Sequence, residues 1–136
     1  MILVDSGPLV ALFDPADPQH AHCGRRLESA EEPLATTVPV LTQVFTLLGP
    51  ASLGSDRLRD FILQGGLSVW FFDAPAMVRT FDLMEAYADQ GMNLADASLM
   101  VAAERLGTRK VFTLGGHDFN VYRVKIGPWY HPLEAW

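Results

Sequence analysis

The sequence is short of cysteine, of positive charge and of long apolar runs, and each shortage excludes a class of protein. Its 136 residues include a single cysteine, Cys23, which rules out an internal disulfide framework and fits a reducing compartment. The apolar stretches fall far short of the ~20 residues that a bilayer crossing needs, and the amino terminus lacks the basic and then apolar pattern of a signal peptide. These absences predict a cytoplasmic protein with no membrane partner.

Positive charge is scarce, because lysine and arginine number 10 against 16 acids and the formal net charge is −6. Phosphate contacts need lysine and arginine, so this balance opposes non-specific binding of nucleic acid. A nucleic-acid ligand would therefore need a local basic patch or metal ions that offset the acids. Two candidate patches are Arg105 with Arg109 and Lys110, and Arg123 with Lys125. The alternative interpretation is a solvated helix end and an exposed strand edge.

Hydrophobic residues make up 49% of the chain and charged residues 19%, which is typical of a globular protein, and the length predicts one domain over residues 1–136. Short apolar segments alternate with helical patterns, which predicts an α/β fold with a parallel sheet. Strands are expected at residues 2–5, 34–36, 67–72, 110–113 and 122–126. Helices are expected from about residue 8, over 17–29, 37–49, 55–65 and 75–90, and from residue 93.

Helical spacing predicts which faces of two helices are buried. In the segment 75–90, Met77, Phe81, Met84 and Ala88 fall on one face, which we expect to pack on the core. The helix that starts at residue 93 is apolar almost all round and rich in alanine, so we expect it to be central and tightly packed.

Exposed-looking aromatic and apolar residues leave two alternatives open. Trp129, Tyr130 and Trp136 make the end of the sequence aromatic, and this segment either packs back onto the sheet or meets a partner chain. Phe61 and Ile62, on a predicted helix, raise the same alternatives, because core packing explains them as well as a contact surface does.

Asp5 and Asp96 are the candidate functional residues. Asp5 closes the first strand, where open parallel sheets place their sites. Asp96 lies in the first turn of the apolar helix, three residues after its expected cap, Asn93. Two such acids suggest a divalent-metal site. Each also has a structural interpretation, because Asp5 can cap the helix opened by Pro8 and Asp96 can interact with a helix dipole.

Four short motifs follow one another along the chain. They are VDSGPLV at 4–10, TTVPVLTQ at 36–43, LADASL at 94–99 and VFTLGGHDF at 111–119. Each motif is weak alone, but in this order and spacing they resemble the PIN domain, and within it the VapC-like toxins of bacterial toxin–antitoxin pairs. The resemblance covers essentially the whole chain. It implies a three-layer α/β/α sandwich around a short parallel sheet, and metal-dependent endoribonuclease activity.

The resemblance also implies a site of three or four acids, of which this sequence keeps two. The first acid matches Asp5 and the third matches Asp96. The second position holds Gln43, where the family pattern has Glu, and the fourth holds Gly115, where it often has Asp. Asn93 lies where many relatives carry another Asp.

These departures weaken the expected metal site. Mg²⁺ prefers oxygen ligands, usually one or two carboxylates with retained waters and substrate phosphate oxygens, so Asp5 and Asp96 can hold one ion. The neutral carbonyl of Gln43 can orient a water, but it adds no charge and cannot act as a general base. With two formal charges lost at Gln43 and Gly115, we expect a single, weakly held Mg²⁺ or Mn²⁺ ion.

Four further residues are candidates for support of the site. Asn93 is either a second ligand layer or only a helix cap, and Ser6 and Thr113 orient the acids or phosphate unless they make ordinary turn hydrogen bonds. Asp118 either compensates for Gly115, helped by the flexibility of the glycine turn, or caps the turn at Phe119.

Three hypotheses follow. The first is a VapC-type ribonuclease, weakened at Gln43 and Gly115, which hydrolyses RNA phosphodiesters with metal-activated water; Asp5 and Asp96 are ligands and Gln43 assists. The second is a catalytically inactive PIN-like module that binds RNA or protein, and the third is an unrelated nucleotide-binding α/β domain. The resemblance implies RNA as substrate, an antitoxin protein as partner and a homodimer.

Overall fold

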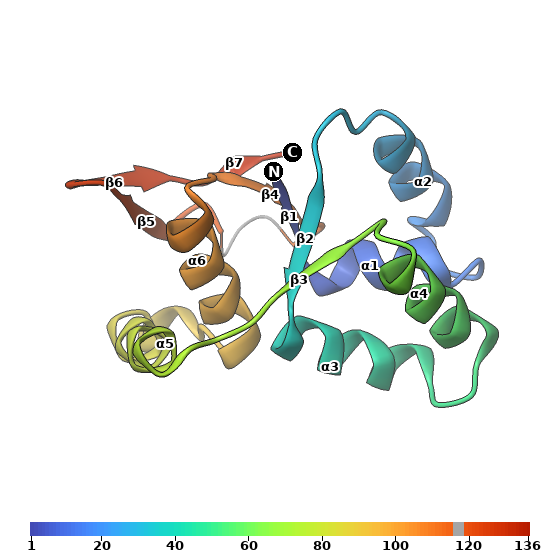
Figure 1. The fold of residues 1–136 in the computed structure, drawn as a ribbon, viewed down its shortest axis with the longest axis horizontal. Coiled ribbons are helices and arrows are strands. Elements are labelled where there is room, and N and C mark those ends of the chain that lie inside the picture. Colours follow the sequence, from blue (N-terminus) through green and yellow to red (C-terminus); the bar gives the residue numbers. More distant parts are fainter. Residues whose placement is uncertain (116–118) are drawn as a thin grey trace.

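The computed structural model describes residues 1–115 and 119–136, and its centre is a parallel sheet with the strand order β3-β2-β1-β4-β7 (Figure 1). The strands are β1 (Ile2–Val4), β2 (Leu34–Thr37), β3 (Ser68–Trp70), β4 (Lys110–Phe112) and β7 (Glu134–Ala135). All residues of β1 and β2 are buried, because helices cover both faces of the sheet. The predicted α/β sandwich is confirmed.

Two groups of helices form the outer layers (Figure 1). They are α1 (Ser6–Phe13), α2 (His20–Glu28), α3 (Val38–Leu48), α4 (Leu53–Leu63), α5 (Ala74–Ala86), the 3-10 turn η1 (Ala88–Gln90) and α6 (Leu94–Leu106). In Figure 1, α5 and α6 lie on one side of the sheet, and α1, α2 and α4 lie on the other. None of the helices in the described ranges is long and apolar enough to cross a bilayer.

The predicted central helix is α6, whose buried side chains are mostly small. Ala95, Ala97, Ala102 and Ala103 are at most 3% exposed, which allows α6 to pack closely on β1 and β2. Leu99 is fully buried on the same helix. The expectation of a tightly packed α6 is therefore confirmed.

Two helices begin elsewhere than predicted, one because a side chain further upstream caps it and the other because a turn precedes it. The helix expected at residue 55 begins at Leu53, since the Ser52 hydroxyl accepts the Ser55 N–H at 3.0 Å. The helix expected at residue 17 begins at His20, since the Asp17 carboxylate accepts the Gln19 N–H at 2.8 Å and holds a turn.

The predicted core-facing residues of the segment 75–90 are only partly correct: Met84 packs against the core, but the most deeply buried residues lie elsewhere on the helix. Ala76, Thr80 and Leu83 face the core, whereas Phe81 is 57% exposed. The small residues at 76 and 80 let α5 approach α6, and the buried Thr80 hydroxyl is satisfied by donating to the Ala76 carbonyl at 2.8 Å. The helix also ends at Ala86 and is followed by η1, so it does not run unbroken to residue 90.

The fifth predicted strand does not join the parallel sheet. β5 (Arg123–Ile126) instead pairs antiparallel with β6 (Trp129–Pro132), and a turn at Gly127, whose φ is +62°, connects the two. The left-handed conformation at Gly127 reverses the chain directly, which suits a glycine. The place at the sheet edge is taken by β7, which follows the hairpin.

The aromatic residues divide between the core and the surface. Trp136 packs back onto the sheet, with its ring 5.1 Å from that of Phe112 and under the guanidinium of Arg26. Trp129 and Tyr130 are 70% and 61% exposed.

The side chains at 61 and 62 pack inward. Phe61 lies 5.7 Å from the Phe13 ring and Ile62 is partly buried against the core, so packing accounts for both.

Candidate active site

Asp5 lies at the carboxyl end of β1, as predicted, and both of its carboxylate oxygens accept hydrogen bonds. Oδ1 accepts the backbone N–H of Ser6 at 2.7 Å, which caps α1, and Oδ2 accepts the hydroxyl of Thr113 at 3.0 Å. Each carboxylate oxygen has a second lone-pair direction, so these bonds orient the group without using up its capacity to bind. The structural and the functional interpretations of Asp5 are therefore compatible.

Burial raises the pKa of Asp5 above its ordinary value. The hydrogen bonds from the Ser6 backbone, from Thr113 and from the Ser6 side chain act in the opposite direction and do not cancel the effect of burial. A carboxylate that is partly buried and held from two sides is typical of a functional site, because a cation there would favour the ionised form.

Asp96 is held at the start of α6 by a capping box. Its Oδ2 accepts the backbone N–H of Asn93 at 3.1 Å, while the Asn93 side chain accepts the Asp96 N–H at 2.8 Å. This confirms the cap predicted for Asn93. The arrangement fixes the direction in which the partly buried Asp96 carboxylate projects from the helix end.

Two adjacent threonines of β2 link the surroundings of the two acids. The Thr36 hydroxyl donates to the carbonyl of Val4, the residue before Asp5, at 2.8 Å. The hydroxyls of Thr37 and Ser98 lie 2.6 Å apart, and Ser98 is two residues after Asp96. All three hydroxyl-bearing residues are buried. The carboxyl end of the sheet and the amino-terminal turn of α6 are thereby tied together, with one acid beside each bond.

The hydrogen bond between the Thr37 and Ser98 hydroxyls has a defined donor. Ser98 Oγ donates to the Ala95 carbonyl at 2.7 Å, so its single proton is used, and the Thr37 hydroxyl must donate to Ser98. Thr37 Oγ1 also accepts the Val40 N–H at 3.5 Å and so caps α3. A single chain of hydrogen bonds therefore connects the start of α3 to the start of α6. Sequence reasoning missed this connection, because it joins residues 61 apart.

Gln43 lies on α3, beside the start of α6. It lines a shallow pocket of about 320 Å³ whose other walls include Pro39, Asn93, Leu94 and Ala95. The partly buried Gln43 is therefore brought to the helix end that carries Asp96, as the resemblance implied for this position. The pocket is mostly apolar and Gln43 adds no charge to it.

The residues present fit one divalent cation better than two. Asp5 and Asp96 supply carboxylate oxygens, and Gly115, which is exposed, supplies no side chain. Among residues 1–115 and 119–136, there is no group of three or more histidine, cysteine, aspartate or glutamate side chains suited to a metal ion. Two carboxylates with waters and a phosphate oxygen are an ordinary Mg²⁺ ligand set. Asp118, the predicted substitute for Gly115, lies outside the described residues.

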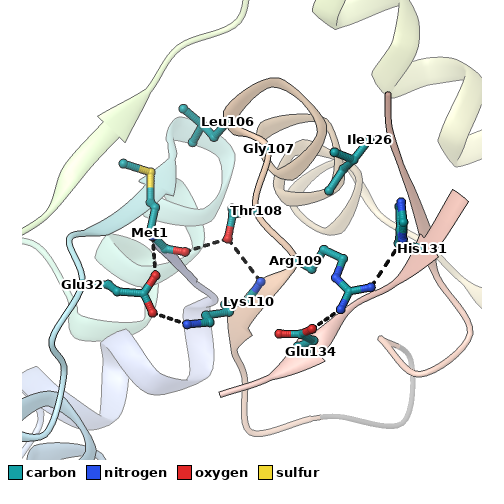
Figure 2. Close-up of a pocket in the computed structure, with 10 residues that line it drawn as sticks. All are labelled: Met1, Glu32, Leu106, Gly107, Thr108, Arg109, Lys110, Ile126, His131 and Glu134. Carbon is teal, nitrogen blue, oxygen red and sulfur yellow. Dashed lines mark hydrogen bonds and ion pairs between the residues drawn. The ribbon is translucent and has the colours of Figure 1, made fainter. Parts of the chain in front are cut away.

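A larger polar pocket of about 460 Å³ lies at the opposite end of the sheet, where the strands begin (Figure 2). Glu32 pairs with both the Met1 amino group, at 2.7 Å, and Lys110, while Arg109 pairs with Glu134.

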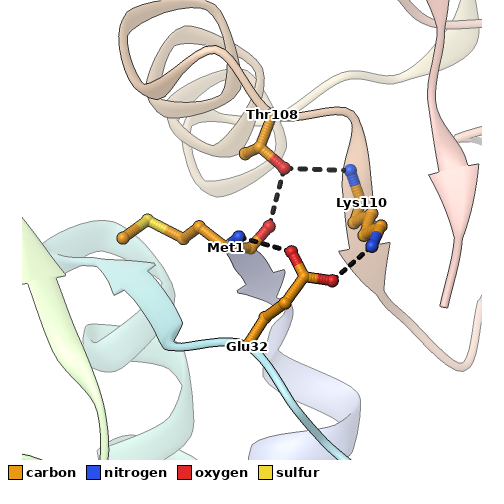
Figure 3. A network of polar contacts seen from close by, with 4 residues as sticks. All are labelled: Met1, Glu32, Thr108 and Lys110. Atoms are coloured by element: carbon orange, nitrogen blue, oxygen red, sulfur yellow. Dashed lines mark hydrogen bonds and ion pairs between the residues drawn. The ribbon is translucent and has the colours of Figure 1, made fainter.

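The Thr108 hydroxyl completes this network by donating to the Met1 carbonyl at 2.7 Å (Figure 3). Because the charged groups of the pocket neutralise one another, it resembles a structural clamp rather than a reaction site.

Comparison with known proteins agrees with this architecture. The PIN domain model matches residues 2–125. Ribonuclease VapC26 of Mycobacterium tuberculosis is 26% identical over 125 residues, which are 90% of this chain and 92% of that protein.

Two solved structures share the fold. The crystal structure of M. tuberculosis VapC20, described as a sarcin-ricin loop cleaving toxin, has a TM-score of 0.80 at 16% identity and covers 96% of this chain and 100% of its own. A toxin–antitoxin complex from Klebsiella pneumoniae has a TM-score of 0.69 at 17% identity and covers 95% and 98%.

The fold is an α/β/α sandwich, with Asp5 at the carboxyl end of its first strand and Asp96 in the first turn of α6. The match over residues 2–125 places the chain within one group of such proteins: it belongs to the PIN domain family. The resemblance found in the sequence motifs is confirmed.

Proposed function

We propose that this PIN-domain protein is a VapC-like endoribonuclease, which hydrolyses RNA phosphodiesters with the help of one Mg²⁺ or Mn²⁺ ion. The observation that carries the proposal is the pair of acids at the ends of two elements, β1 and α6, that the Thr36 and Thr37 hydrogen bonds tie to β2. The relationship to a ribonuclease along 90% of the chain supports the same activity.

Each residue of the site has a role in this proposal. Asp5 and Asp96 hold the cation, which when bound supplies an activated water and offsets charge on the scissile phosphate. Thr113 keeps the Asp5 carboxylate in one orientation through its 3.0 Å hydrogen bond. Gln43 orients a water with its side-chain amide. Asn93 positions Asp96 through the capping box.

The second candidate is a binding module without catalysis. It is favoured by the amide at Gln43, which cannot take a proton from water, and by the absence, among the described residues, of any group of three or more histidine, cysteine, aspartate or glutamate side chains suited to a metal ion. This candidate predicts that RNA or a protein partner binds the same end of the sheet without any metal requirement.

An RNA cleavage assay separates the two candidates. The parent protein, Asp5→Asn and Gln43→Glu are incubated with a mixed RNA pool in Mn²⁺, in Mg²⁺ and in chelator. We expect weak metal-dependent cleavage by the parent, loss of at least about 100-fold in Asp5→Asn, and a gain of about 10-fold or more in Gln43→Glu, because the new carboxylate strengthens the metal site. Glu85→Gln, an exposed change on α5, serves as the control for altered charge.

Three results of the RNA cleavage assay would contradict or change the proposal. Full activity in Asp5→Asn would overturn the assignment of the site. If the parent does not cleave RNA but Gln43→Glu does, the fold of the site is intact and the amide at position 43 prevents cleavage. If no variant cleaves RNA, the binding module is favoured.

We also propose that an antitoxin protein and a second copy of the chain are its protein partners. Support comes from the toxin–antitoxin complex that shares its fold and from apolar side chains at the surface of α3 and α4. Leu47 and Leu53 are 69% and 63% exposed, and Leu47 lines a second apolar pocket of about 320 Å³ with Gln43. A partner on this face would lie next to the candidate active site.

A further inference from the structure

Of the two basic patches predicted from the sequence, only the second has cations that are not paired with a carboxylate among the described residues. Arg105 pairs with Asp73 at 3.1 Å, Arg109 pairs with Glu134, and Lys110 pairs with Glu32. Each cation of the first patch is therefore neutralised by a carboxylate.

The second patch is different. Arg123 donates to the neutral carbonyls of Asn120 and Tyr122, both at 3.0 Å, and the Lys125 amino group lies 6.0 Å from the centre of the Tyr130 ring. Neither cation makes an ion pair within the part of the chain that the structure describes.

The register of the β5–β6 hairpin places these cations on one face with an aromatic ring. Lys125 lies opposite Tyr130, and Arg123 lies opposite Pro132. Because side chains alternate along a strand, these four residues share the outer face, whereas the buried Val124 points inward. We call Arg123, Lys125, Tyr130 and Pro132 the hairpin face.

We propose that the hairpin face binds single-stranded RNA, with its two cations on successive phosphates and Tyr130 stacked against a base. Alternate residues on a strand are ~6.6–6.8 Å apart, which is close to the separation of neighbouring phosphates in an extended strand. A ring that is 61% exposed, beside two cations that no carboxylate of residues 1–115 or 119–136 pairs with, is the combination with which proteins hold single strands. In a chain of net charge −6, such a surface is a local exception.

The hairpin lies beside the carboxyl-terminal part of α6, whose first turn carries Asp96, so an RNA strand that reached both would run along this helix. The backbone N–H of Lys125 donates to Glu104 on α6 at 2.6 Å, and Glu104 is eight residues beyond Asp96, or ~12 Å along the helix. The hairpin extends outward beyond α6 (Figure 1). The family match ends at residue 125, so β6 and Tyr130 lie beyond what the family model describes.

This inference takes its ligand from the proposed function, but its test needs no catalysis. Asp5→Asn protein in chelator is titrated into a labelled single-stranded RNA of about 16 nucleotides, and fluorescence anisotropy is followed between about 50 and 200 mM salt. The hairpin variant carries Arg123→Gln and Lys125→Gln. The matched control carries Arg105→Gln and Arg109→Gln, which change the net charge equally.

We expect the hairpin variant to bind at least about 10-fold more weakly. The slope of log K against log salt should become shallower by about 1.4, because each of the two phosphates that the variant no longer neutralises accounts for ~0.7. The control should bind nearly as the parent does. Tyr130→Ala should bind roughly 5- to 150-fold more weakly, whereas Tyr130→Phe, which keeps the ring, should retain affinity. Circular dichroism verifies that these changes leave the fold intact.

Equal weakening of RNA binding in the hairpin variant and the control would overturn the proposal, because net charge alone would explain it. Unchanged RNA binding in the hairpin variant, or none by the parent, would also overturn it and leave the face to a protein partner. Absence of cleavage in the nuclease assay, with hairpin-dependent binding here, would reject the enzymatic function and leave this inference standing.

Discussion

At the scale of single residues, Asp5 combines two properties that act against each other. It caps α1 and accepts the Thr113 hydroxyl, yet burial raises its pKa. The folded protein therefore binds more protons than the unfolded chain at pH values between the ordinary pKa of about 4 and the raised value. Stability due to Asp5 is complete below this window and is lost as the pH rises through it.

We predict that Asp5→Asn makes the protein more stable at pH 7 and has little effect below about pH 4, where the native carboxyl is already neutral. Thermal unfolding across this pH range measures the difference. Asp73→Asn is the control of opposite sign, because hydrogen bonds from Arg105 and from the Ala76 backbone lower the pKa of exposed Asp73, so its removal should destabilise at pH 7. A destabilised Asp5→Asn at pH 7 would mean that hydrogen bonding outweighs burial.

The same experiment reports on the metal. At a Mn²⁺ concentration ten times the dissociation constant, the parent should gain about 1.4 kcal/mol, and Asp5→Asn should gain much less. The two acids themselves could be found from sequence, because each follows a local pattern: the end of an apolar strand and the first turn of a capped helix. The burial of Asp5 and its bond to Thr113 depend on contacts across 108 residues, which no local pattern contains.

At the scale of elements, the Thr37–Ser98 bond joins the starts of α3 and α6 and hence the elements that carry Gln43 and Asp96. Both hydroxyls are fully buried, so the loss of the Thr37 hydroxyl removes a buried hydrogen bond to Ser98 and the acceptor of the Val40 N–H.

We predict that Thr37→Val, which keeps the shape but removes the hydroxyl, lowers the free energy of unfolding by about 1–3 kcal/mol. It should also weaken Mn²⁺ binding, because Asp96 loses its fixed position relative to the sheet. Thr37→Ser keeps the hydroxyl and is the matched control for the Mn²⁺ titration. If the Mn²⁺ affinity of Thr37→Val and of Thr37→Ser fell in the same proportion to their loss of unfolding free energy, a positioning role for the Thr37 hydroxyl would be contradicted.

The elements also show where sequence reasoning reaches its limit. The strands before Asp5 and Thr113 and the cap at Asn93 were predictable, because apolar runs and caps are local signals. The buried face of α5 was not, because Ala76 and Thr80 are chosen by the close approach of α6 rather than by hydrophobicity. The pairing of β5 with β6, in place of the sheet, was equally hidden, since alternating residues suit either arrangement.

At the scale of the whole molecule, the surface of α3 is the place where we expect a second copy to bind. Leu47, one helical turn from Gln43, is 69% exposed at the edge of an apolar pocket. We predict a dimer in sedimentation equilibrium and at least about 10-fold weaker association for Leu47→Asp, because the charge must be desolvated at the interface. Leu63→Asp, at an 83% exposed position on α4, is the control. A dimer unaffected by Leu47→Asp would place the interface elsewhere.

The strand order has a consequence for how the protein folds during its synthesis. β1 precedes the other strands of the sheet in the sequence and lies between β2 and β4, and the Thr113 hydroxyl that holds Asp5 is made 108 residues later. During vectorial synthesis the ribosome must release most of the chain before β4 can dock. Asp5 therefore stays without the Thr113 hydrogen bond until β4 has emerged from the ribosome, and its carboxylate reaches its final orientation only late in folding.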